Sequence, residues 1–160
     1  MIGSGYTNPS KLAIMGGSNG GLLVGAAMTQ RPDLFRAVVA QVGVFDMLRY
    51  QNFTIGNAWI SEYGSSNDSI QFNNLINYSP LHHLADKNYP ATLIMTGDHD
   101  DRVPPLHSYK FAAALQGRNQ SSHPILLLTQ KNAGHHGPSA YYEDILEKDY
   151  VYGFILHELK

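Results

Sequence analysis

The sequence contains no cysteine. This absence excludes disulfide frameworks, thiolate zinc sites and cysteine nucleophiles. Long apolar runs are also missing, because uninterrupted ones such as residues 22–24 and 125–128 fall far short of the roughly 20 residues that span a bilayer. The first five residues, MIGSG, have neither the basic nor the apolar region of a signal peptide. We therefore expect a cytoplasmic protein with no membrane partner.

Charge is scarce and balanced in sign. Eleven Lys and Arg residues against thirteen Asp and Glu residues give a net charge of −2, and no basic stripe is visible. A nucleic acid or an anionic membrane surface is therefore not an expected partner. With 43% hydrophobic and 15% charged residues, the 160-residue chain has the composition of a folded domain that buries a sizeable core.

Short apolar runs alternate with helical patterns along the chain. We expect strands at residues 11–15, 37–42, 91–96 and 124–129, and helices at residues 20–30, 69–77, 105–116 and 139–159. Gly117 is expected to stop the third of these helices. Because the strands are almost continuously apolar, the pattern predicts an α/β fold with a mostly parallel sheet flanked by helices. Ligands bind outside the carboxyl ends of such strands, so the residues that follow each strand are the functional candidates.

The first of these segments carries the pattern G-x-S-x-G, at residues 16–20 (GGSNG). This pattern is typical of a nucleophile elbow, in which serine lies in a tight turn between a strand and a helix. The residues two before and two after the serine must be small; Gly16 and Gly20 meet that need, and Gly21 adds further room. The turn leaves backbone N–H groups free at the helix start, so the N–H of Asn19 is the expected oxyanion donor. A glycine-rich turn that binds phosphate, or nothing, is the plainer alternative.

A serine hydroxyl needs a base to take its proton, and the base needs a carboxylate to hold its tautomer. The chain offers these groups in the order typical of α/β-hydrolases: Ser18, then an acid within residues 98–101, then a histidine within residues 135–136. Within each cluster the candidates stay open: Asp98, Asp100 and Asp101 for the acid, His135 and His136 for the base. A metal site is the rival interpretation, but the elbow has no role in one and no i, i+4 ligand pair is present.

Beyond the triad pattern, distinctive segments run through the chain, at residues 16–24 (GGSNGGLLV), 30–35 (QRPDLF), 41–48 (QVGVFDML), 54–59 (TIGNAW), 62–64 (EYG), 78–82 (YSPLH), 98–103 (DHDDRV), 105–108 (PLHS) and 133–135 (AGH). Through these segments nearly the whole chain resembles the prolyl oligopeptidase family of serine peptidases. The resemblance implies the C-terminal portion of an α/β-hydrolase fold. It also implies a serine endopeptidase that cleaves on the carboxyl side of proline in short peptides, with no cofactor.

The resemblance assigns the roles that spacing leaves open. It implies Ser18 as the nucleophile, Asp100 as the orienting acid and His135 as the base of an acyl-enzyme mechanism. The implied substrate-binding residues are Arg102, which holds a backbone carbonyl, and Val44, Trp59, Tyr63 and Val103, which form an apolar pocket for proline. An indole stacked on a pyrrolidine ring buries apolar area with a definite geometry. Asp98, His99 and Asp101 are then expected to shape the loop that presents Asp100 and Arg102.

The resemblance also implies a longer protein, with a β-propeller and further hydrolase strands upstream of the nucleophile strand. We therefore expect residues 1–160 to be a partial catalytic domain, with the propeller and the upstream strands absent and with impaired activity alone. The family's second oxyanion donor, a tyrosine hydroxyl from the upstream region, has no counterpart in this sequence. The oligomeric state is not predicted.

Two alternative functions remain. One is an esterase or an acylaminoacyl or oligopeptidase B-like hydrolase, which a comparison of a simple ester with a proline peptide would separate. The other is a non-catalytic hydrolase-like module that mediates an interaction. Unchanged activity or binding after Ser18→Ala would favour that module.

Overall fold

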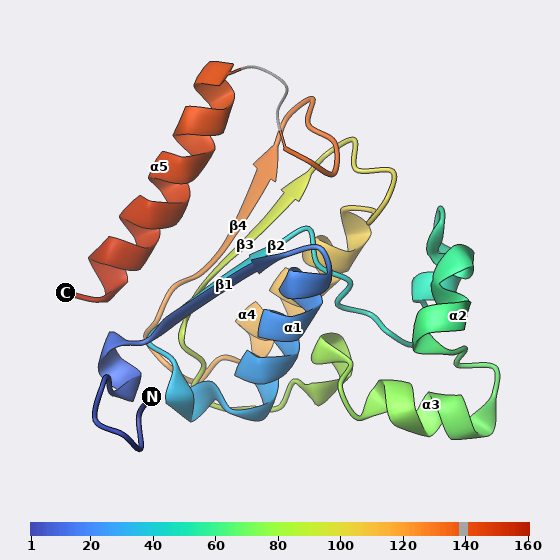
Figure 1. The fold of residues 1–160 in the computed structure, drawn as a ribbon, viewed down its shortest axis with the longest axis horizontal. Helices are drawn as coiled ribbons and strands as arrows, with labels where there is room; N and C mark the ends of the chain where they lie inside the picture. The colour runs from blue at the N-terminus through green and yellow to red at the C-terminus, as the bar shows by residue number, and fades with distance from the viewer. Residues whose placement is uncertain (138–140) are drawn as a thin grey trace.

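Within residues 1–137 and 141–160, which the computed structural model describes, four parallel strands form one sheet (Figure 1). They are β1 (Ala13–Gly17), β2 (Ala37–Gln41), β3 (Ala91–Gly97) and β4 (Ile125–Gln130), and they lie side by side in chain order. The register places Ala13 beside Ala37, Ala37 beside Ala91 and Thr92 beside Ile125. The predicted α/β fold is confirmed, and the carboxyl ends of the four strands meet at one end of the sheet.

Helices cover both faces of this sheet. α1 (Asn19–Gln30) and α4 (Leu106–Arg118) lie on one face, and α5 (Tyr141–Glu158) lies on the other (Figure 1). Side chains of β2 alternate between the two layers, since Val38 is buried in the core shared with α1 and α4, whereas Val39 is buried with Val151 of α5. The strands are apolar on both faces because both faces are covered.

The long connection between β2 and β3 holds α2 (Ile60–Tyr63) and α3 (Ser69–Ile76), which lie away from the sheet (Figure 1). This segment forms an apolar cluster of its own around Tyr50 and Leu75, both fully buried. The cluster also contains Leu22 of α1 and Val103 from the loop after β3. Short 3-10 turns complete the element order, at Pro9–Lys11, Pro32–Leu34, Tyr50–Asn52, Gly56–Trp59 and Pro80–His83.

The first strand begins later in the chain than the sequence predicts. β1 begins at Ala13 rather than at Lys11, because Pro9–Lys11 forms a 3-10 turn whose N-cap is Asn8. The strand continues through both glycines that precede Ser18. The predicted start of the last helix, Ser139, lies outside the described residues.

The predicted stop at Gly117 is wrong, because α4 runs through it to Arg118. The N–H of Asn119 still donates to the carbonyl of Leu115, at 2.9 Å, and so closes the last turn. A Cβ at Gly117 would meet nothing within 4 Å, so the position is open to solvent. Glycine costs a helix only about 1 kcal/mol relative to alanine, which the packing of buried residues such as Leu115 offsets.

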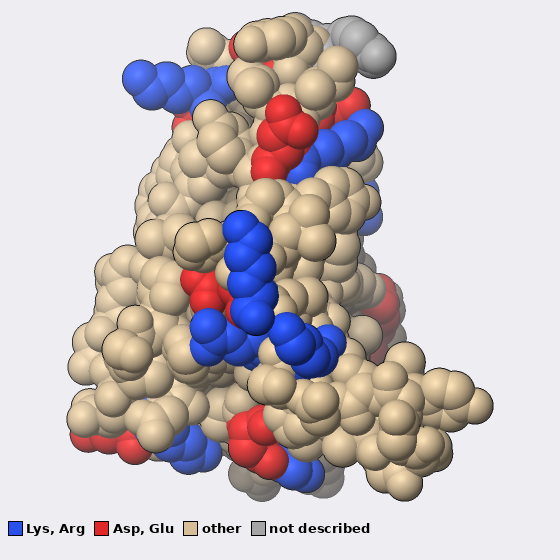
Figure 2. Space-filling model, turned by 90° about the vertical axis from the view of Figure 1, so that its left-hand side faces the viewer, with Lys and Arg blue, Asp and Glu red and all other residues tan. Residues whose placement is uncertain are grey.

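The surface carries few charged groups. On the face turned toward the viewer in Figure 2, uncharged surface predominates, and acidic and basic side chains lie next to one another. Arg36 and Glu158 form one such pair, with 3.3 Å between Nη2 and Oε2. Among the helices of the described residues, none combines the length and the hydropathy that a membrane crossing requires.

Candidate active site

Ser18 lies in the sharp turn between β1 and α1. Its backbone has φ 57° and ψ −117°, a conformation that residues with a side chain rarely adopt. Its N–H donates to the carbonyl of Gln41 at 2.9 Å, and its own carbonyl accepts from Leu22 at 3.1 Å. The turn is therefore held from β2 and from the first turn of α1, and it presents the hydroxyl at the carboxyl end of the sheet.

Two of the glycines around Ser18 are required because no side chain would fit at their positions, and one is not. A Cβ at Gly16 would lie 2.3 Å from the carbonyl oxygen of Gly20, and one at Gly21 would lie 2.5 Å from that of Gln41. A Cβ at Gly20 would meet nothing within 4 Å. The prediction that Gly20 must be small is therefore wrong. The glycine that is required after the serine is Gly21, because α1 and β2 leave no space for a side chain there.

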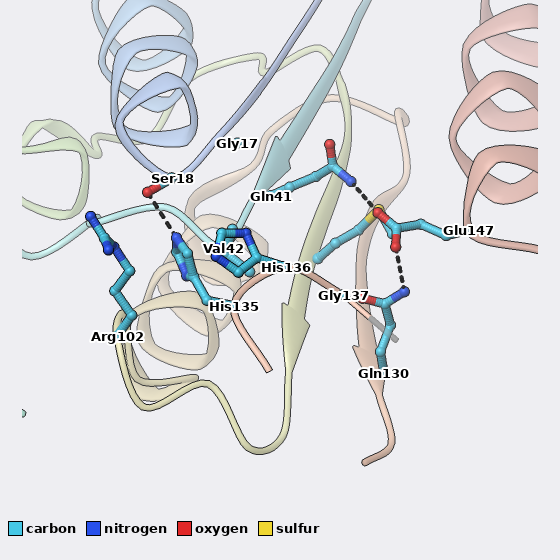
Figure 3. Close-up of a pocket in the computed structure, with 11 residues that line it drawn as sticks. Gly17, Ser18, Gln41, Val42, Arg102, Gln130, His135, His136, Gly137 and Glu147 are labelled. Carbon is cyan, nitrogen blue, oxygen red and sulfur yellow. Dashed lines mark hydrogen bonds between the residues drawn. The ribbon is translucent and has the colours of Figure 1, made fainter. Parts of the chain in front are cut away.

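Two hydrogen bonds connect Ser18, His135 and Asp100. Oγ of Ser18 lies 2.9 Å from Nε2 of His135 (Figure 3). Nδ1 of His135 lies 2.8 Å from Oδ2 of Asp100. The three residues come from the loops after β1, β4 and β3, which the sheet brings together. Of the candidates that the spacing left open, these are the ones within hydrogen-bonding distance.

Asp100 is buried and is oriented by the backbone that follows it. Its Oδ1 accepts from the N–H groups of Arg102 at 3.0 Å and Val103 at 2.8 Å. These two bonds occupy one carboxylate oxygen and aim the other at His135. The side chain of Asp100 is fully buried, so its remaining hydrogen bond to His135 is shielded from water.

The other acids and histidines of the two clusters lie around the triad. Asp98 pairs with His99 at 2.6 Å, and its Oδ1 also accepts from the N–H of Ala133 at 3.3 Å. The hydrogen bond from His99 lowers the pKa of Asp98, although burial opposes it. Asp101 is exposed. The Asp98 contact thus links the acid loop to the loop that carries His135, and His136 stacks edge-on against His135 with ring centroids 5.5 Å apart.

The four residues predicted to bind proline belong to one apolar cluster. Val44 and Val103 are each 2% exposed, and Trp59 and Tyr63 pack against the same cluster as partly buried side chains. Trp59 and Tyr63 meet edge to face, with ring centroids 6.5 Å apart. The long β2–β3 connection therefore builds an apolar aromatic wall next to α1.

Tyr63 connects this wall to the elbow, because its hydroxyl donates to Oδ1 of Asn19. Burial raises the pKa of Tyr63 and the nearby Glu62 raises it further, so the hydroxyl keeps its proton and stays a donor. Nδ2 of Asn19 lies 3.4 Å from Oε1 of Glu62. The side chain of Asn19 is thus fixed from α2, while its backbone N–H lies at the start of α1, where the helix offers no partner.

Arg102 lies beside the triad. Its guanidinium is on the side of His135 away from His136, at the level of Ser18 (Figure 3). A pocket of about 410 Å³ opens here, and its lining includes Ser18, Arg102 and His135 together with Glu147 of α5. The arrangement can bind an extended acyl compound with its carbonyl near both Ser18 and a fixed positive charge.

Sequence reasoning missed two features next to the site. Tyr50 lies at the centre of the aromatic wall, stacked on Trp59 with ring centroids 6.3 Å apart, and burial raises its pKa to about 12. Asp46 is a fully buried carboxylate; burial alone would raise its pKa, but the hydrogen bond and charge of Lys110 lower it. Both follow β2 in a stretch without a catalytic residue pattern, so only the fold shows that they support the site.

Comparisons with known proteins agree with this geometry. The prolyl oligopeptidase family model matches residues 1–160. The prolyl endopeptidase of Dictyostelium discoideum is 53% identical over 140 residues, which are 84% of this chain and 18% of that protein.

Solved structures give the same result for the fold. A prolyl endopeptidase structure aligns with a TM-score of 0.95 at 48% identity, over 99% of this chain and 24% of the other. Oligopeptidase B from Leishmania major aligns with a TM-score of 0.96 at 28% identity, over 99% of this chain and 22% of the other. The chain therefore spans about a fifth of the length of the relatives it matches.

Proposed function

The chain belongs to the prolyl oligopeptidase family, and from this premise we propose that residues 1–160 are part of a peptidase catalytic domain that cleaves on the carboxyl side of proline. The observation that carries the proposal is the pair of hydrogen bonds, 2.9 and 2.8 Å, that joins Ser18 through His135 to Asp100. The unusual backbone of Ser18 supports it, because such strain is typical of a nucleophile elbow.

In the proposed reaction, Oγ of Ser18 attacks the carbonyl carbon of a proline residue while its proton passes to Nε2 of His135. Asp100 keeps the other ring proton on Nδ1 and stabilises the imidazolium. The N–H of Asn19 donates to the oxyanion of the tetrahedral intermediate. His135 then protonates the leaving amine. Water attacks the acyl-enzyme with His135 as base, which releases the product and restores the Ser18 hydroxyl.

Two groups account for substrate choice in this proposal. The apolar wall of Val44, Trp59, Tyr63 and Val103 receives the proline ring, which is flat and apolar enough to pack on the indole. Arg102 donates to a backbone carbonyl of the peptide, since a guanidinium is always charged and presents its donors in a fixed plane. The substrate is thus a proline-containing oligopeptide.

A serine-directed fluorophosphonate probe tests the nucleophile. We expect the probe to label the wild-type chain at Ser18, as located by mass spectrometry of the peptides. The Ser18→Ala chain should remain unlabelled, and His135→Ala should label far more slowly because the base is gone. Equal labelling of wild type and Ser18→Ala would contradict the proposal.

A substrate panel tests the specificity. A Gly-Pro reporter should be cleaved faster than a Gly-Arg reporter, and Trp59→Ala should lower that preference more than it lowers hydrolysis of a simple ester. Preference for the Gly-Arg reporter would favour an oligopeptidase B-like activity. Preference for the simple ester would favour an esterase.

A further inference from the structure

Glu147 of α5 bridges two strands at the carboxyl end of the sheet. Its Oε1 accepts from Nε2 of Gln41 at 2.8 Å, and its Oε2 accepts from Nε2 of Gln130 at 2.9 Å (Figure 3). Gln41 is the last residue of β2 and Gln130 is the last residue of β4. Both carboxylate oxygens of Glu147 therefore hold the sheet at the strand ends from which the catalytic loops leave it.

The backbone of the same two glutamines supports the triad loops. The carbonyl of Gln41 accepts from the N–H of Ser18 at 2.9 Å, and the carbonyl of Gln130 accepts from the N–H of Asp98 at 3.0 Å. Gln41 therefore bonds the nucleophile turn with its backbone and Glu147 with its side chain. Gln130 likewise bonds the loop that carries Asp100 with its backbone and Glu147 with its side chain.

Glu147 also lies against the far end of the histidine loop. His135 sits in a turn closed by the N–H of Gly137 donating to the carbonyl of Gly134 at 3.2 Å. Gly137 has φ 84°, and a Cβ there would lie 2.9 Å from Oε2 of Glu147. Asp98 holds this loop at Ala133, as described above, and Glu147 packs against it at Gly137, on the other side of His135.

We propose that Glu147 is a positioning residue, which sets the Ser18–His135 geometry by fixing the ends of the nucleophile, acid and histidine loops together. This inference rests on the proposed function. Catalytic groups must be held within a fraction of an ångström, and a displacement of about 1 Å at a distance from the chemistry can cost a hundredfold in rate.

The bridge uses both oxygens of the carboxylate as acceptors. Both glutamines present N–H donors, and a carboxylate accepts at both oxygens, whereas an amide accepts at one atom and donates at the other. Glu147→Leu therefore keeps roughly the size of the side chain but leaves both glutamine amides without their acceptor. Glu147→Gln is the conservative variant, because its amide accepts from Gln41 and donates to Oε1 of Gln130 once the Gln130 amide has turned over.

The test measures fluorophosphonate labelling of Ser18, resolved into the binding constant and the maximal rate. We expect Glu147→Leu to lower the maximal rate about ten- to a hundredfold with little change in binding. Glu147→Gln should keep most of the wild-type rate. Glu143→Leu, which changes an exposed carboxylate one turn earlier on α5, makes the same chemical change as Glu147→Leu and should stay within about twofold of wild type.

A second readout does not depend on labelling. The low-field proton NMR signal of the His135 ring proton bonded to Asp100, assigned by its loss in Asp100→Asn, should broaden or shift in Glu147→Leu and stay near its wild-type position in Glu147→Gln. An unlabelled wild-type chain would overturn the proposed function, and this signal would then decide the positioning role alone. Wild-type labelling and an unchanged signal in Glu147→Leu would overturn the positioning role and leave the proposed function standing.

Discussion

The turn that places the Ser18 hydroxyl requires an unfavourable backbone conformation at this residue. A residue with a side chain at φ 57° and ψ −117° loses on the order of 1–3 kcal/mol, whereas glycine tolerates positive φ. We expect Ser18→Gly to remove fluorophosphonate labelling. We also expect the Ser18→Gly variant to be about 1 kcal/mol more stable than Ser18→Ala, because the relief of backbone strain exceeds the extra conformational entropy that glycine gives the unfolded chain. Urea unfolding of the two variants measures the difference. Equal stabilities would mean that the turn is not strained.

His107 gives the fold a predicted dependence on pH. Its Nδ1 accepts the N–H of Asp46 at 3.2 Å, which requires an unprotonated nitrogen. Burial lowers the pKa of His107 from 6.5 to about 4; the charges of Asp46 and Asp100 oppose this shift, and that of Lys110 adds to it. As the pH falls, the unfolded chain binds this proton first. Stability is therefore complete above about pH 6.5 and falls by on the order of 3 kcal/mol by about pH 4.

Unfolding free energies across this pH range check the prediction. His107→Gln keeps an acceptor for the Asp46 N–H but does not titrate, so it should flatten the curve. His157→Gln, at an exposed position on α5, should leave the curve unchanged. If the unfolding free energy of His107→Gln varied with pH as strongly as that of wild type, groups other than His107 would cause the pH dependence.

The sequence identifies residues whose type carries chemistry, and it misses those whose role depends on contact. Ser18, Asp100 and His135 follow predicted strands in a recognisable order, and they lie within hydrogen-bonding distance of one another. Glu147 is one of several acids on α5, and its partners lie 106 and 17 residues away along the chain. No local pattern distinguishes it, because the contact exists only after the sheet and α5 have packed.

At the scale of elements, α1 approaches the end of β2 closely, and this approach depends on Gly21. A Cβ at this position would lie 2.5 Å from the carbonyl oxygen of Gln41 and 2.8 Å from Cα of Gly43. Gly21→Ala must move the helix, and overpacking of this kind costs about 1–3 kcal/mol. Because the first turn of α1 also carries Asn19 and holds Ser18, we expect slower labelling as well as lower stability.

Gly20→Ala is the matched control for this prediction. Its Cβ would meet open space, and alanine favours a helix over glycine by about 1 kcal/mol. Gly20→Ala should therefore be as stable as wild type or slightly more so in thermal unfolding. If both alanine variants were equally destabilised, the close contact between α1 and β2 would not be the cause.

The existence of the elements could be predicted more securely than their ends. Apolar runs indicate where strands lie, and all four strands occur within two residues of the expected ranges. The helix end at Gly117 could not be read from the sequence, because glycine is compatible with both a stop and an exposed helical position. The β2–β3 connection lacks a strong period, so the aromatic wall that it builds was suggested only by the family resemblance.

For the whole molecule, the parallel sheet explains why residues over 100 positions apart meet. Ser18 and His135 are 117 residues apart in the chain, yet their loops leave the same end of the sheet. The sequence predicts this meeting, because parallel strands place their carboxyl ends together. It does not predict which helix covers that end, and α5 is the helix that brings Glu147 there.

The sheet also has two open edges among the described strands, β1 and β4. At the β1 edge Met15 is 48% exposed, on the face of the sheet that α5 covers elsewhere. An edge strand with unpaired N–H and C=O groups next to apolar surface is a template for association. We therefore expect residues 1–160, when produced alone, to self-associate as their concentration rises through roughly the micromolar range.

Sedimentation velocity over a concentration series measures this association. Met15→Glu places a charge on the β1 edge itself and should shift the chain toward monomer. Ile70→Glu makes a comparable change on α3, at a side chain 73% exposed but away from the sheet, and should leave the association unchanged. A wild-type chain that stays monomeric throughout the series would show that the β1 edge does not drive association. Equal effects of both variants would instead indicate a general response to added negative charge.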